Sequence, residues 1–372
     1  MYYAFRIIIA AALAAASFQS ARRARADWEF RRGTPEAVAS AVDLAPSNAE
    51  YLLFRALQLD YDGADATPLL ERAAALNSTG SAARIRLGLG AEIRGDYESA
   101  EKWLLDAARV DRQFEPRWTL ANFYFRRENV PEFWTWLRAA LEVSYGDRRP
   151  ACGLAWRTGS PAAEIARAIP ERREVIAAYL GYLLDTHLTL DAAPVALKLA
   201  SLHNPADHPL LLAACDEFLR ANLADAAQDL WRTLYGGHTG IYAGNFETPR
   251  IGHGFDWRAD ELTGVVQLDL EAPARRRIVF DGRQPASCDP LRQTALLEPG
   301  RRYTLHWESR LNGIKSPTGI EWRIAGVRAP VEATELSFTA PARLAALTLH
   351  YDRPLGEARA EGSVELWSIV LN

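Results

Sequence analysis

Cysteine is scarce in this sequence, and its placement excludes two kinds of small domain. The 372 residues contain three cysteines, Cys152, Cys215 and Cys288, and no C-x-x-C pair. A disulfide framework needs an even set of cysteines, and a Cys-ligated zinc site needs paired thiols, so neither is predicted. We expect three small buried side chains, because free cysteine is among the most buried residue types.

The chain also lacks an excess of one charge sign. It has 43 Lys and Arg residues against 47 Asp and Glu residues, a formal net charge of −4, and no long basic run. Nucleic acid is therefore not expected as a main partner. Only three of the basic residues are lysines, and this strong preference for arginine indicates GC-rich coding and a bacterial source.

Catalytic signatures are absent as well. The sequence has no H-E-x-x-H, G-x-S-x-G, Walker or G-x-G-x-x-G motif. His203 and His208 are five residues apart, a spacing that neither a helix nor a strand turns into a metal pair. We expect a protein that is not an enzyme and that needs no cofactor or metal. Carboxylates for glycoside hydrolysis need only a separation in space, so a polysaccharide-acting enzyme stays an alternative.

The N-terminus has an apolar run, but it is short. Arg6 precedes the twelve residues Ile7 to Phe18, too few to span a bilayer, and Ala24-Arg25-Ala26 resembles a cleavage site. This pattern predicts a signal peptide over residues 1–26 and a periplasmic or secreted protein. Three arginines after the apolar run, Arg22, Arg23 and Arg25, oppose translocation. The alternative is therefore the Ala-rich first helix of a cytoplasmic protein.

The remaining chain has the composition of a soluble globular protein, with 49% hydrophobic and 24% charged residues. Its length predicts two domains or more. A search for internal repeats finds a period of 34 residues, with copies starting at Ser47, Ser81 and Glu115. In the best copy Leu87 and Gly88 begin a set of small and apolar positions, which continues with Ala91, the turn Gly95-Asp96-Tyr97, Ala100, Leu104 and Ala107.

Related positions occur before and after this copy. Leu53, Leu57 and Ala73 precede Leu87, Ala91 and Ala107 by 34 residues, and Ala121, Phe125 and Leu141 follow them by 34. Asp191-Ala192-Ala193 and Asp225-Ala226-Ala227 are 34 apart too. Between these blocks, residues 146–172 are rich in Gly and Pro and predict a loop with one short helix at most.

This period resembles the tetratricopeptide (TPR) helix-turn-helix repeat. The resemblance implies an α-solenoid over residues 27–235 that docks a protein partner. Generic helical hairpins are the alternative. The candidate protein-binding residues, an aromatic and basic group, are Tyr124, Arg126, Arg127, Trp134 and Trp136. The tryptophans are equally open to interpretation as core residues between helices.

Beyond Tyr235 the pattern changes from helix to strand. Gly236-Gly237 ends the helical pattern, and apolar residues then alternate with polar ones, as at Tyr303, Leu305 and Trp307. About eight such strands predict an antiparallel two-sheet sandwich of jelly-roll type over residues 236–372. The predicted fold class is therefore α+β multidomain, a TPR-like α-solenoid followed by a jelly-roll β-sandwich.

Several motifs of this region resemble the galactose-binding-like jelly roll of bacterial carbohydrate-binding modules. They are Asn245-Phe246-Glu247, Gly254-Phe255-Asp256-Trp257, Gln293 with Leu297 to Tyr303, Phe338 to Pro341, and Val364-Glu365-Leu366. The resemblance implies a glycan ligand. In such modules an acidic pair often holds calcium, and Glu247 and Glu365 occupy comparable places. The usual paired Asp is missing, however, so we predict no metal.

Sugar recognition needs flat aromatic faces and hydrogen-bonding side chains. The candidate ligand-binding residues are Asp256, Trp257, Arg258, Arg310, Tyr351 and Arg353. Trp322 alternates with Glu321 and Arg323, so it is assigned to the core. The first hypothesis is an exported, non-catalytic scaffold whose helices dock a protein and whose sandwich binds a glycan or a second partner, in assembly or export of a cell-surface polysaccharide. The second is a pure protein-interaction adapter whose sandwich is a structural cap.

Overall fold

The computed structural model describes residues 2–372, so the first residue of the predicted signal peptide, Met1, lies outside the described residues. The chain forms two compact units, one up to Pro170 and one from Glu171 to Asn372. The change from helix to strand lies elsewhere, between Tyr235 and Val265.

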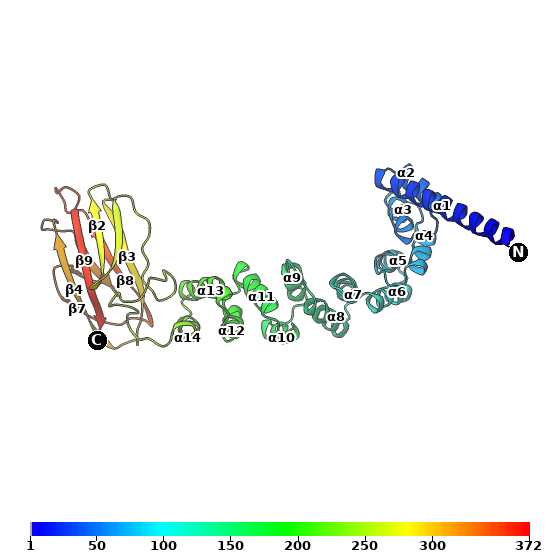
Figure 1. The fold of residues 1–372 in the computed structure, drawn as a ribbon. Coiled ribbons are helices and arrows are strands. Elements are labelled where there is room, and N and C mark those ends of the chain that lie inside the picture. Colours follow the sequence, from blue (N-terminus) through cyan, green and yellow to red (C-terminus); the bar gives the residue numbers. More distant parts are fainter. Residues whose placement is uncertain (1) are drawn as a thin grey trace. The chain divides into compact units, whose positions relative to one another are not determined.

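The first unit consists of helices that pair with their neighbours in sequence as antiparallel hairpins, as Figure 1 shows. Its helices are α1 (Tyr2–Arg32), α2 (Pro35–Leu44), α3 (Ala49–Tyr61), α4 (Thr67–Leu76), α5 (Ala82–Ile93), α6 (Tyr97–Val110), α7 (Phe114–Arg126), α8 (Val130–Glu142), α9 (Arg149–Trp156) and α10 (Ala162–Ala168). Within residues 2–372, no helix carries an apolar stretch long enough to cross a membrane.

Polar caps fix where several of these helices begin. Asn48, Asp96 and Asn129 each accept backbone N–H groups in the first turn of the helix that follows, which satisfies donors that have no intrahelical partner. Inside the α5–α6 hairpin the helices approach closely at Gly88. A Cβ there would lie 2.6 Å from Cγ of Leu104, so the glycine of the repeat is a packing requirement.

The repeat register differs slightly from the predicted 34 residues in the first copy. Leu52 and Ala56 are fully buried, whereas the predicted Leu53 and Leu57 are half-buried. Measured to Leu87, the first copy is therefore offset by 35 residues. The connection between α3 and α4 is longer than the one between α5 and α6, and this changes the spacing of the buried face.

Residues 146–172 contain more structure than the sequence predicted. Both α9 and α10 lie here, separated by Gly159, and they bury Cys152, Leu154 and Ile165. The glycines and prolines shorten the helices without removing them, because Pro150 and Pro161 stand at helix starts, where a missing N–H costs nothing.

The second unit begins with four more helices and a 3₁₀ turn. They are α11 (Arg173–Asp185), α12 (Thr189–Ala200), η1 (Pro205–Asp207), α13 (His208–Arg220) and α14 (Ala224–Tyr235). The buried faces repeat every 35 residues, as at Leu183 and Phe218. Ala192 therefore corresponds to Ala227, not to the predicted Ala226, because the repeated Asp-Ala-Ala letters are one residue out of phase with the core.

An antiparallel β-sandwich follows (Figure 1). Its strands are β1 (Val265–Glu271), β2 (Ala274–Asp281), β3 (Ser287–Leu296), β4 (Arg302–Asn312), β5 (Ile320–Ile324), β6 (Val327–Pro330), β7 (Glu335–Thr339), β8 (Leu344–Asp352) and β9 (Glu361–Leu371). They form the sheets β1-β2-β9-β4-β7 and β3-β8-β5-β6. The chain changes sheet repeatedly, as the predicted jelly roll requires.

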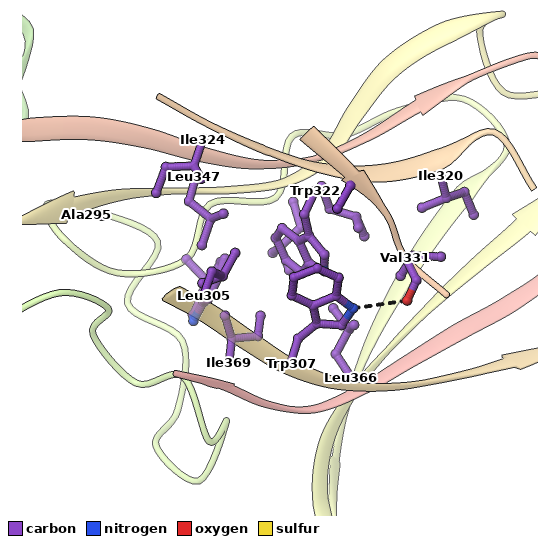
Figure 2. Close-up of a cluster of buried hydrophobic side chains, with 14 of the residues drawn as sticks. Ala295, Leu305, Trp307, Ile320, Trp322, Ile324, Val331, Leu347, Leu366 and Ile369 are labelled. Carbon is purple, nitrogen blue, oxygen red and sulfur yellow. Dashed lines mark hydrogen bonds between the residues drawn. The ribbon is translucent and has the colours of Figure 1, made fainter. Parts of the chain in front are cut away.

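The sandwich core lies between the two sheets. Figure 2 shows Leu305, Trp307 and Ile369 of one sheet facing Trp322 and Leu347 of the other. The indole nitrogen of Trp307 donates to the Val331 carbonyl at 3.0 Å. The period-two prediction is correct here, and the assignment of Trp322 to the core is confirmed by its complete burial. All three cysteines are free and buried, as expected.

Candidate functional site

The largest hollow of the first unit lies between α3 and α5, the first helices of two successive hairpins. It has a volume of about 670 Å³. Leu57 and Leu89 form apolar parts of its wall, and Ile93 lies at its edge with an exposed fraction of 87%. Asp65 and Arg94 also line it. We call this surface the α3–α5 hollow; it offers apolar contact together with charges of both signs.

A second hollow, of about 420 Å³, lies between α7 and α9. Phe125, Val130 and Phe133 contribute apolar surface, and the guanidinium of Arg157 lies 5.1 Å from the centre of the Phe125 ring. A cation held over an aromatic face is favourable, so this hollow is also partly ordered by its own side chains. We call it the α7–α9 hollow.

The predicted protein-binding residues do not gather on one face. Tyr124 and Arg126 line the α7–α9 hollow, whereas Arg127 stacks over the ring of Tyr97 at 3.7 Å. The remaining two, Trp134 and Trp136, are half-buried on α8, the second helix of its hairpin.

Tyr124 and Arg126 also serve the array itself. The Tyr124 hydroxyl donates to Glu101 at 2.6 Å, and burial together with this carboxylate raises the pKa of Tyr124. Arg126 makes a bidentate pair with Glu92 of α5 at 2.8 and 2.7 Å. Neither residue was expected to tie hairpins together, because the sequence does not show which side chains meet across a period of 34 residues.

In the second unit, the loop that contains Gly254-Phe255-Asp256-Trp257 packs on the last helical hairpin. Phe255 is fully buried, with its ring 6.0 Å from Trp231 of α14 and 4.7 Å from His238. Gly254 has φ +57°, and a Cβ there would lie 2.3 Å from the Trp231 ring. Only glycine fits this contact, which we call the helix–sandwich junction.

Polar contacts reinforce the junction. Asp216 of α13 accepts hydrogen bonds from the backbone N–H of Gly254 at 2.7 Å, from Arg258, and from His253 at 2.7 Å. Arg343 adds a second connection, because it pairs with Asp225 of α14 and donates to Gln228 at 2.8 Å. The sandwich is therefore fastened to α13 and α14 at two places.

This arrangement corrects the placement of the candidate ligand residues from Asp256 to Arg258. Asp256 is buried and accepts from the backbone N–H groups of Ile251 and Gly252, so it closes its own loop. Trp257 is 1% exposed and donates to the Ala243 carbonyl. Neither presents a surface to a sugar, because the loop is pressed between the helices and the sandwich core.

Burial within the junction also perturbs acid–base groups. Loss of solvent lowers the pKa of His238 from 6.5 to about 4, so this imidazole is neutral between Phe255 and Tyr242. Burial likewise raises the pKa of the Cys215 thiol to about 12, which makes it an unreactive core group.

Among the other candidate ligand residues, Arg310 is the one that lines a hollow. Its guanidinium lies 5.4 Å from the centre of the Trp367 ring, and the hollow around both, of about 550 Å³, includes Glu308 and Glu332. Tyr351 is fully buried in the core, and Arg353 is exposed but lies outside this hollow. Sequence reasoning missed Trp367, although its position between buried Leu366 and half-buried Ser368 marks it as facing away from the core.

The acidic pair considered for calcium is engaged elsewhere. Glu365 is 5% exposed and is held by Arg275 and Arg277, and Glu247 accepts from the side chain of Asn245 at 2.6 Å. Within residues 2–372, no group of three or more His, Cys, Asp or Glu side chains is arranged to hold a metal ion.

One chain of polar side chains on the sandwich has the order of a hydrolytic triad. Oγ of Ser287 lies 3.4 Å from Nε2 of His350, whose Nδ1 lies 2.6 Å from Oδ1 of Asp289. Acyl transfer also requires donors for the oxyanion and a pocket for the substrate. None of the three residues lines the hollows described above.

No protein-family model and no curated protein matches this chain. Solved structures match its helical half. The Cut9–Hcn1 hetero-tetramer of the APC/C shares 16% identity over 54% of this chain, with a TM-score of 0.30; the match covers only 39% of that chain. The C-terminal part of a TPR repeat-containing protein from Cytophaga hutchinsonii shares 15% identity over 56% of this chain and 92% of its own, with a TM-score of 0.29. The pilF protein of Pseudomonas aeruginosa shares 16% identity over 59% and 93%, with a TM-score of 0.23.

Proposed function

We propose that this protein is an adapter whose helical array binds an extended segment of a partner protein. The observation that carries the proposal is the α3–α5 hollow, where first helices of successive hairpins leave an apolar wall beside side chains of both signs. Stacked hairpins use such surfaces to hold a peptide, because each repeat adds side chains in the same orientation.

The expected ligand follows from the lining. Leu57 and Leu89 favour an apolar anchor residue, and Asp65 and Arg94 suit polar groups on either side of it. Ile93 and Tyr61 are 87% and 92% exposed at the ends of α5 and α3, so a bound segment would cover apolar surface that now faces water.

A peptide library displayed on phage and selected against the full chain tests this proposal. Selected peptides should bind Ile93→Asp at least tenfold more weakly than the unchanged protein, because a carboxylate then meets the apolar anchor. The matched control is Leu190→Asp, an exposed leucine of α12 with an exposed fraction of 73%, which should leave binding unchanged. Equal affinity for both variants would refute docking at the α3–α5 hollow.

Glycan binding by the sandwich is the second candidate function, and the hollow around Trp367 favours it. An aromatic ring with Arg310 above it and the carboxylates Glu308 and Glu332 nearby provides the residue types that sugars require. Titration of the full chain with soluble bacterial polysaccharides is the test. Trp367→Ala and Arg310→Ala should abolish binding, while Arg353→Ala, outside the hollow, should not.

If no polysaccharide binds, the sandwich is proposed to act as a cap of the array. The helix–sandwich junction supports this role, because Phe255 covers Trp231 on the last helix and thereby shields an apolar face that a terminal repeat would otherwise expose.

The adapter proposal includes no catalysis, and the Ser287–His350–Asp289 chain allows a direct test of that point. A fluorophosphonate probe is expected to leave Ser287 unlabelled, since no pocket positions a substrate beside it. Labelling of the full chain that disappears in Ser287→Ala would instead indicate a hydrolase.

A further inference from the structure

Helix α1 has two halves that differ in their surroundings. The second half belongs to the fold of the first unit. Ala26 is completely buried with Ala41 and Tyr51, and the ring of Phe30 stacks on Tyr51 with a centroid distance of 4.5 Å. Arg22 reaches the Asp43 carbonyl of α2 at 3.1 Å.

The first half has no such packing. Every residue from Phe5 to Ala21 is exposed, including Ile7, Ile8 and Leu13, with exposed fractions between 64% and 69%. From Ile7 to Ala16 the sequence contains only Ile, Ala and Leu, so this stretch is apolar on all sides of the helix.

These two halves bear on the predicted cleavage after Ala26. A cut at that bond would remove a residue that is completely buried against α2 and α3, and it would separate Arg22 from its contact on α2. The cleavage site is thus inside a packed helix, and its removal would expose Tyr51 and Ala41 to water. Retention of the whole helix preserves that core.

The kind of partner follows from the shape of the apolar surface. A protein that packs on one side of α1 would leave the other sides in water, and the stretch from Ile7 to Ala16 lacks a polar face that could take that position. Hydrocarbon covers a helix on all sides. Arg22, Arg23 and Arg25 directly follow the apolar half, where they would meet anionic headgroups.

We propose that α1 is retained in the mature protein and inserts its half from Phe5 to Phe18 into a lipid bilayer, with Arg22, Arg23 and Arg25 among the headgroups. This half is about 20 Å long at 1.5 Å per residue, shorter than the hydrocarbon core of about 30 Å. It therefore enters one leaflet without crossing the membrane, in agreement with the absence of a membrane-spanning helix within residues 2–372. The proposal is independent of the adapter function.

Sedimentation of the full chain with lipid vesicles tests the insertion. The protein should sediment with vesicles of phosphatidylcholine mixed with phosphatidylglycerol. Ile8→Asp combined with Leu13→Asp should stay in the supernatant, and Leu190→Asp, which changes an exposed leucine outside α1, should sediment normally. Arg23→Gln with Arg25→Gln should weaken binding about fivefold per charge, and this effect should vanish on pure phosphatidylcholine.

Intact mass measurement on protein isolated from producing cells tests retention. A mass that includes residues 2–26 is expected, and an N-terminus at Asp27 would overturn the proposal. Failure to bind either kind of vesicle would also overturn it. So would a lipid-free oligomer that Ile8→Asp with Leu13→Asp dissociates, because the apolar half would then be covered by a second copy of the chain.

Discussion

At the scale of single residues, the junction depends on side chains whose role is set by their neighbours. Gly254, Phe255 and Asp216 come from a loop and a helix that are 38 residues or more apart for the polar contact. A glycine is needed because Trp231 occupies the space of its Cβ, and an aspartate is needed because three donors converge on it.

Gly254→Ala is predicted to destabilise the second unit by about 3 kcal/mol, because the methyl group overlaps Trp231 and the backbone stays at positive φ. The control is Gly252→Ala, which also has positive φ but nothing within 4 Å of its Cβ, and which should cost about 1 kcal/mol. Denaturant unfolding measures both. Equal losses would mean that the close contact with Trp231 contributes nothing.

The pKa of His238, lowered by burial to about 4, predicts a pH dependence of stability. Above pH 6.5 the imidazole is neutral in both states. As the pH falls from 6.5 toward 4, only the unfolded chain takes up the proton, so stability decreases, by at most about 3 kcal/mol. Unfolding curves of His238→Gln should show a flatter profile in this window. An unchanged profile would assign the dependence to other groups.

At the scale of elements, the sequence predicted helices and strands from their periodicity, and the differences lie in register. Leu52 replaces Leu53 in the core, and Ala227 replaces Ala226, because the length of each connection decides which residue of a helix faces inward. The glycine positions of the repeat are more informative than its letters, since Gly88 marks where two helices approach.

Helical glycines provide a test of that packing. Gly88→Ala should destabilise the first unit by about 1–2 kcal/mol, because Cβ would lie 2.6 Å from Leu104. Gly181→Ala in α11, with nothing within 4 Å of its Cβ, should stabilise by about 0.5–1 kcal/mol through helix propensity. Thermal unfolding compares the two. A stabilising Gly88→Ala would contradict the close approach of α5 and α6.

At the scale of the whole molecule, helices and sandwich are joined within the second unit. The compact unit that starts at Glu171 includes α11 to α14 together with all nine strands. Asp216, Arg258 and Arg343 connect the two kinds of structure. A ligand on the sandwich and a partner on the last hairpin would therefore act on one body.

Asp216→Ala is predicted to lower the stability of the second unit by about 2–3 kcal/mol, because it leaves Arg258 and the Gly254 N–H without their acceptor. The control is Asp229→Ala of α14, whose carboxylate is 42% exposed and pairs only with Arg232 through its side chain; it should cost less than about 0.5 kcal/mol. Hydrogen exchange should report faster opening of α13 and β3 in Asp216→Ala alone. Identical exchange in both variants would mean that this carboxylate does not fasten the sandwich.

The sequence alone determined the order of helices followed by strands and most of their inward faces, because periodicities of 3.6 and 2 are local properties of the chain. It also identified Gly254-Phe255-Asp256-Trp257 as a significant motif. Only the tertiary structure decided what that motif does. Its partners Asp216 and Trp231 lie on helices far upstream, and burial against them turns residues expected to face a sugar into the contact that holds the sandwich to the array.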